Sequence, residues 1–106
     1  PPAPVTTYFR RELTLPADPA QLALWLSARV DDGAVIYVNG VEVLRLNLPP
    51  GPVGPDTYAT APVDPAGWST GNPIPSDLLV PGVNVLAAEV HQAAPGNGTM
   101  VFGASL

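Results

Sequence analysis

The 106-residue chain contains no cysteine, which excludes disulfides, thiolate metal sites and cysteine nucleophiles. Basic residues are also scarce: four arginines stand against nine acidic residues, for a net charge of −5. Because phosphate backbones repel an acidic chain without a basic patch, we expect no nucleic-acid partner. No apolar run approaches the roughly 18 residues that a membrane-spanning helix needs, so we expect no membrane insertion.

The motifs of common enzymes are missing as well. There is no glycine-rich phosphate loop, nucleophile elbow or zinc motif. The sole histidine, His91, follows Glu89 by two residues, but no further histidine or metal-ligand spacing supports acid–base chemistry there. A structural or surface role for His91 is therefore favoured, and we predict that the chain is not an enzyme.

Proline and glycine are abundant, with 15 and 10 residues spread along the chain. Hydrophobic residues make up 46%, which is enough for the core of one domain. We therefore predict an all-β fold, an antiparallel β-sandwich of the jelly-roll type with about eight strands. The segments that alternate or are rich in β-branched residues are 6–15, 21–30, 34–38, 41–47, 57–63, 83–92 and 99–106, with one short strand expected within 64–75 and one helical turn, capped by Ser76, over 76–82.

The N-terminal residues have a composition that is typical of a stiff, extended linker. We expect a linker over 1–6 and a single β-sandwich domain over 7–106. The chain then corresponds to a module of a longer protein.

Asn39-Gly40 is typical of a type I′ turn, because both positions favour positive φ. A two-residue turn pairs Val38 with Val41, and an uninterrupted ladder then places Asp32 opposite Asn47, with their Cβ atoms about 5 Å apart. The sequence therefore predicts that the hairpin brings these two side chains together.

Asp31, Asp32 and Asn47 would supply two carboxylates and an amide oxygen, which are the hard oxygen ligands that calcium prefers. Calcium takes about six to eight ligands, so loop carbonyls or water would complete the shell. The alternative is that Asp31-Asp32-Gly33 only caps a turn, because aspartate binds nearby backbone groups and glycine adopts unusual dihedral angles.

Four segments, YFRRELTLPAD, DDGAVIYVNGVEVLR, LLVPGVNVLAAEVHQ and FGASL, resemble the galactose-binding-like jelly-roll domains of secreted bacterial hydrolases and phosphatases. They are also similar to the sugar-binding domain of β-galactosidase-type glycoside hydrolases. The resemblance covers most of the chain and implies a non-catalytic, extracellular carbohydrate-binding module with neighbouring domains in the same chain.

The segment DDGAVIYVNG is similar to part of the anthrax protective-antigen-like lectin domains. In those domains two adjacent aspartates hold a calcium ion, which in turn holds sugar hydroxyls. This resemblance implicates Asp31 and Asp32 in binding calcium.

Aromatic residues in loops are a further signature of sugar binding, because a flat ring stacks on the C–H face of a pyranose. Trp68 and Tyr58 are the candidates, with Asn72 as a polar partner. An anchoring role for Trp68 is the open alternative, since large aromatics dominate small cores. Trp25 lies within a strand segment and is expected to pack.

The alternation of residues 6–15 puts Arg11 on the apolar face, where a buried guanidinium needs a partner such as Glu89. Taken together, the sequence predicts a carbohydrate-binding accessory module assisted by calcium. The alternative is a ligand-free structural or interaction domain that packs against a neighbouring catalytic domain.

Overall fold

The computed structural model describes residues 6–15, 24–61, 68–93 and 101–105. Within these ranges the chain has no α-helix, which confirms the all-β prediction. The elements are β1 (Thr6–Leu15), β2 (Leu24–Asp31), β3 (Gly33–Val38), β4 (Val41–Leu46), β5 (Trp68–Ile74), the 3₁₀ turn η2 (Ser76–Leu78), β6 (Gly82–His91) and β7 (Val101–Ser105).

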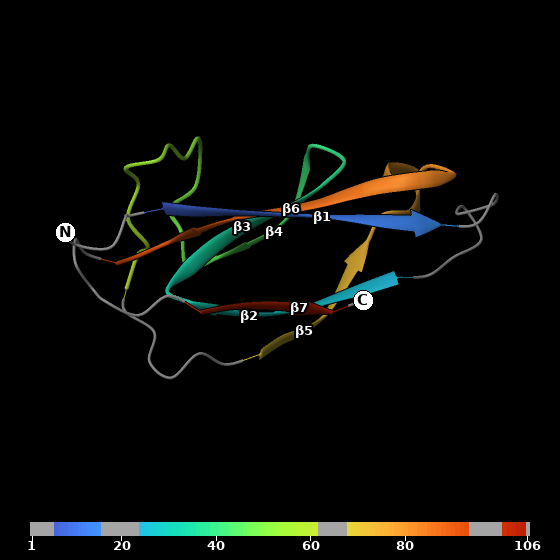
Figure 1. The fold of residues 1–106 in the computed structure, drawn as a ribbon. Coiled ribbons are helices and arrows are strands. Elements are labelled where there is room, and N and C mark those ends of the chain that lie inside the picture. The colour runs from blue at the N-terminus through green and yellow to red at the C-terminus, as the bar shows by residue number, and fades with distance from the viewer. Residues whose placement is uncertain (1–5, 16–23, 62–67, 94–100, 106) are drawn as a thin grey trace.

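The strands form two antiparallel sheets that face each other as two layers (Figure 1). The four-stranded sheet has the order β1-β6-β3-β4, and the three-stranded sheet has the order β5-β2-β7. Only Asp32 separates β2 from β3, although these strands belong to different sheets. The acidic dipeptide thus lies at the corner where the chain passes from one layer to the other.

The core lies between the sheets and depends on the even-numbered positions of β2 and β3. Leu26, Ala28, Ala34 and Ile36 are fully buried there, and the alternation of residues 21–30 predicts this for Leu26 and Ala28. Trp25 occupies an odd-numbered position and is 54% exposed. The expectation that Trp25 packs is wrong, because its position in β2 faces away from the core.

The strand expected within 64–75 is present as β5. It is longer than the short strand predicted and has seven residues. Two features accommodate its glycine and proline. β5 is a sheet edge, where proline is tolerated, and the pairing with β2 shifts register beside Gly71, which has φ +71°.

The predicted strand at 57–63 is wrong over its described part, residues 57–61. The backbone there makes single hydrogen bonds to two separate neighbours, from Ala59 N–H to the Gln92 carbonyl at 2.8 Å and from Thr60 N–H to the Asn47 carbonyl at 2.8 Å. The described residues therefore form seven strands.

The helical turn expected over 76–82 is present only as the short η2. Pro75 occupies the position before it, and no side chain caps the turn. The expected cap from Ser76 is therefore wrong.

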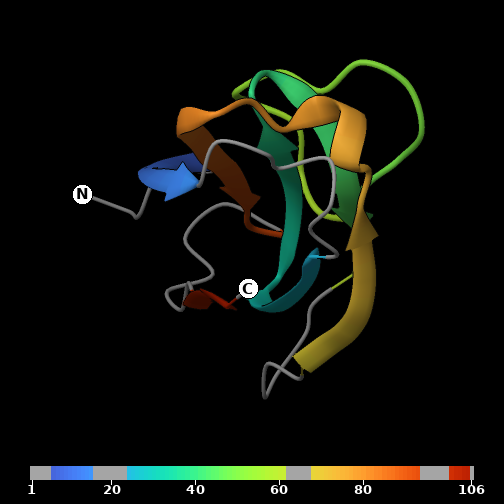
Figure 2. The ribbon, with the colours of Figure 1, turned by 90° about the vertical axis from the view of Figure 1, so that its right-hand side faces the viewer.

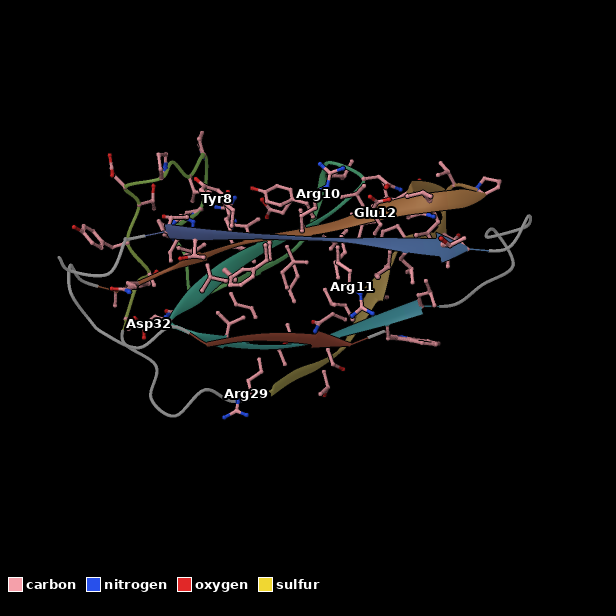
Figure 3. The ribbon with its side chains drawn as sticks, in the orientation of Figure 1. Tyr8, Arg10, Arg11, Glu12, Arg29 and Asp32 are labelled. Carbon is pink, nitrogen blue, oxygen red and sulfur yellow. The ribbon has the colours of Figure 1, made fainter. Side chains whose placement is uncertain are left out.

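Side chains of β1 point alternately to the two sides of its sheet (Figure 3). Tyr8, Arg10 and Glu12 project away from the three-stranded sheet, whereas Arg11 projects towards it. Arg11 stays exposed because β1 is an edge strand, so its expected burial is wrong. Glu89 pairs with Tyr8 in the register and lies on the opposite face from Arg11.

Candidate functional site

Asp32 is buried and hydrogen-bonded at the corner between β2 and β3. It is 2% exposed, and its Oδ2 accepts a hydrogen bond from Ala93 N–H at 2.8 Å. At Gly33 an added Cβ would lie 2.7 Å from the Asn47 carbonyl oxygen and 2.9 Å from that of Leu46. The hydrogen bond from Ala93 connects the corner to the residues that follow β6. The close approach at Gly33 places the corner against the end of β4.

The predicted register of the hairpin holds only near its turn. Asn39 and Gly40 have φ +50° and +83°, and Val38 pairs with Val41, as predicted. A bulge next to Tyr37 then shifts the ladder by one residue, so that Leu46 pairs with Ala34 and not with Gly33. The predicted pairing of Asp32 with Asn47 is therefore wrong as a ladder position.

Asn47 nevertheless contacts the corner from the end of β4. It adopts φ +53°, and its Nδ2 donates to the main-chain oxygen of Asp32 at 3.2 Å and to that of Ala61 at 2.5 Å. The amide of Asn47 thus presents its N–H groups, not its oxygen, to the Asp32 carbonyl.

The calcium prediction depends on what these groups offer to a cation. Asp32 has one carboxylate oxygen bound to Ala93 N–H, and Asn47 donates to the nearby carbonyls. Among the described residues, no three histidine, cysteine, aspartate or glutamate side chains come together as metal ligands. The side chain of Asp31 lies outside the described residues, so the described donors alone give only part of a calcium shell.

The three predicted sugar-binding residues lie on two different parts of the fold. Tyr58 is 40% exposed in the loop 48–61, which packs on the four-stranded sheet. Trp68 and Asn72 belong to β5 of the three-stranded sheet. The Asn72 amide donates to the Leu26 carbonyl at 3.0 Å, and Trp68 pairs with a residue of β2, with its side chain outside the described residues. The structure does not gather these residues into one site.

The loop 48–61 covers one end of the outer face of the four-stranded sheet (Figures 1 and 2). Buried Val35, Leu48 and Ala59 form a small second core beneath it, with Tyr37 packed alongside. Thr6 at the start of β1 donates to the Pro55 carbonyl of this loop, whereas Tyr8, two residues later on β1, stays exposed.

Register places two rows of side chains across this outer face, since directly paired residues lie on the same side of a sheet. One row is Tyr8, Glu89, Val35 and Arg45, and the other is Arg10, Ala87, Tyr37 and Glu42. Tyr8 is 61% exposed, whereas Glu89 has a side chain only 14% exposed. An open aromatic ring therefore lies beside a recessed carboxylate.

Hydrogen bonds fix the polar groups of this face. Burial, the negative charge of Glu89 and a hydrogen bond to Glu89 raise the pKa of Tyr37 above its ordinary value. Arg45 Nη2 donates to Glu42 Oε1 at 2.7 Å, and Nη1 donates to the carbonyls of Pro49 at 2.5 Å and Gly51 at 2.7 Å. Arg45 thus serves to hold the start of the loop 48–61.

Sequence reasoning did not find the group formed by Tyr8, Tyr37 and Glu89. The alternation of residues 6–15 does place Tyr8 opposite Phe9 and Leu13, and this is the available signal. The order β1-β6-β3-β4 brings the three side chains together, and no local pattern encodes that order. Chemically, the group offers a stacking ring, a hydroxyl and a hydrogen-bond acceptor.

Comparison of the chain with protein-family models, with curated proteins and with solved structures gives no match. In the described part of the chain, no helix has the length and apolar character needed to cross a membrane.

Proposed function

We propose that the chain is a non-catalytic carbohydrate-binding accessory module of a secreted bacterial protein, with a galactose-binding-like jelly-roll fold. The observation that supports it is the exposed ring of Tyr8 beside the carboxylate of Glu89 on the outer face. A flat ring stacks on the C–H face of a pyranose, and adjacent polar groups bind its hydroxyls. Such a module holds its parent protein near a polysaccharide and raises the effective concentration there.

The outer face supports this proposal better than the predicted loop residues do. Tyr8 and Glu89 are paired neighbours on β1 and β6, so the sheet fixes their separation before any ligand binds. Tyr58 lies in the loop 48–61 whereas Trp68 and Asn72 lie on β5, so no strand pairing fixes the separation of Tyr58 from the other two. Preorganised groups lose less conformational entropy on binding.

A glycan array followed by calorimetric titration tests the proposal. Tyr8→Ala removes the stacking ring and is expected to weaken binding to the strongest array ligand about tenfold or more, which corresponds to about 1.4 kcal/mol. Trp25→Ala removes an exposed aromatic ring from the other sheet and is the matched control. Absence of binding to every glycan on the array would reject the proposal.

The second candidate is a ligand-free structural or interaction domain, and Trp25 is the observation that favours it. Trp25 is 54% exposed and pairs with the exposed Pro73 on the side of the three-stranded sheet that faces away from the core. Exposed tryptophans often anchor protein interfaces. A neighbouring domain docked there would protect Trp25 fluorescence from iodide quenching in the longer protein but not in this chain.

Calcium assistance through Asp31, Asp32 and Asn47 stays a prediction. It is independent of the outer face, because the corner contacts do not involve Tyr8 or Glu89.

A further inference from the structure

We propose that Glu89 is the hydroxyl-accepting group of the outer face, that it selects neutral sugars over uronic acids, and that His91 behind it is a positioning residue. This inference rests on the proposed function and names the ligand class of the same site. It is carried by the contacts that the buried His91 makes with Glu89 on one side and with the loop 48–61 on the other.

His91 is fully buried at the end of β6, and its two ring nitrogens face different groups. Nδ1 lies 2.5 Å from the Thr57 carbonyl oxygen and 3.0 Å from Thr6 Oγ1. A carbonyl can only accept a hydrogen bond, so Nδ1 carries a hydrogen. The Thr6 hydroxyl donates to the Pro55 carbonyl at 2.6 Å, which leaves its oxygen free to accept from Nδ1–H.

This assignment also fixes how the ring meets Glu89. Nε2 lies 3.4 Å from Glu89 Oε1. Because the Nδ1 contacts hold the buried ring in place, the ring limits the positions that the Glu89 carboxylate can adopt.

The remaining groups around Glu89 leave its charge available to a ligand. Tyr37 donates a hydrogen bond to it from β3. Arg45, in the same row, already donates to both carboxylate oxygens of Glu42 and to two main-chain carbonyls. Arg10 lies in the adjacent row, and Glu12, two residues along β1, offsets its charge on the same face.

A carboxylate in this setting accepts sugar hydroxyls and repels a second carboxylate. Hydrogen bonds to charged groups are stronger than neutral ones, so a neutral sugar gains from Glu89. A uronic acid placed on Tyr8 would bring its own negative charge to the same row. The expected ligand is therefore a neutral pyranose whose adjacent hydroxyls point towards Glu89.

The probes are hexamers of glucose, xylose, mannose and galactose, and hexamers of glucuronic and galacturonic acid. The wild-type chain is expected to bind at least one neutral hexamer and to bind the uronic acid hexamers at least tenfold more weakly. Glu89→Gln keeps the side-chain size and should weaken binding of the neutral hexamer about tenfold or more. Glu12→Gln makes the same charge change on the same face and should alter affinity less than about twofold.

A comparison of single and double variants separates the positioning role from a structural one. His91→Asn removes the contact with Glu89, while its amide can still donate to the Thr57 carbonyl. It should weaken binding of the neutral hexamer in the wild-type background and change it less than about twofold in the Glu89→Gln background, because the ring acts through Glu89. A merely structural role of His91 would weaken binding to the same extent in both backgrounds.

The outcomes distinguish this inference from the proposed function. If a neutral hexamer binds and Glu89→Gln binds it equally well, the role of Glu89 is overturned while carbohydrate binding stands. Equal affinity for a uronic acid hexamer overturns the ligand class. An equal effect of His91→Asn in the wild-type and Glu89→Gln backgrounds overturns the role of His91. If no hexamer binds, the inference fails, and the proposed function fails with it only where the glycan array shows no binding either.

Discussion

At the scale of single residues, the segment Asp31-Asp32-Gly33 is first of all a corner between two sheets. The Asp32 carboxylate accepts Ala93 N–H, and Gly33 lets the backbone approach two carbonyl oxygens of the β4 end. The sequence predicts the turn residues correctly, because aspartate and glycine are suited to such a change of direction. It does not show that the turn changes sheets, since that depends on the partners of β2 and β3.

Gly33→Ala is expected to destabilise the chain by about 2–4 kcal/mol. Its Cβ would lie 2.7 Å from the Asn47 carbonyl oxygen and 2.9 Å from that of Leu46, and backbone atoms cannot move away as a flexible side chain can. Gly54→Ala is the matched control, because nothing lies within 4 Å of its added Cβ. Urea unfolding measures both variants, and equal free energies of unfolding would contradict the close approach at Gly33.

Tyr37 gives the structure a pH dependence at alkaline pH. Its pKa is raised, chiefly by burial and then by Glu89, so the folded chain holds the phenol proton more tightly than the unfolded chain. The resulting stability is present below the ordinary tyrosine pKa of about 10 and is lost as pH rises through the folded-state value. The free energy of unfolding should therefore fall less steeply above pH 10 in Tyr37→Phe than in the wild type. Tyr58→Phe is the control, and identical slopes in wild type and Tyr37→Phe would contradict the expectation.

At the scale of elements, the hairpin β3–β4 shows what local sequence does and does not determine. Turn chemistry at Asn39-Gly40 predicts the hairpin and its first pairs, since both residues take positive φ. The bulge beside Tyr37 is not encoded in that chemistry, and it moves every later pair by one residue. The same limit applies to β5, whose proline is tolerated because the strand is an edge.

The side chain of Asn39 also holds the hairpin against β6 and the end of η2 by hydrogen bonds, so the contribution of these bonds to stability can be tested. Its Nδ2 donates to the Leu78 carbonyl at 2.7 Å and to Asn84 Oδ1 at 2.8 Å, and its Oδ1 accepts from Val85 N–H at 2.8 Å. Asn39→Gly keeps positive φ accessible but removes all three bonds, so we expect a loss of about 2–3 kcal/mol in chemical unfolding. Gly40→Ala strains the turn while keeping the bonds, at a cost of about 1 kcal/mol. If Asn39→Gly is as stable as the wild type, the three Asn39 hydrogen bonds contribute nothing to stability.

At the scale of the whole molecule, the order of strands creates the outer face. Of the strands that the structure describes, β1 is the first and β6 the sixth, yet they pair along ten positions and set Tyr8 against Glu89. The loop 48–61 lies over part of the same face and buries Val35. Alternation within each strand predicts which side chains share a face, but only the global pairing decides which of them become neighbours.

The predicted calcium site also depends on the whole fold, because its residues come from the ends of β2 and β4 and from the corner between the sheets. If Asp31 completes a shell with Asp32 and Asn47, calcium binds the folded chain alone, and at a hundred times its Kd it adds about 2.7 kcal/mol of stability. We expect a higher melting temperature in calcium than in chelator, lost in Asp31→Asn and kept in Asp77→Asn, whose carboxylate is exposed on η2. Equal melting temperatures in calcium and chelator would contradict the calcium prediction. The corner would then be stabilised by its hydrogen bonds alone, in which the Asn47 N–H groups bind carbonyls that a cation would otherwise use.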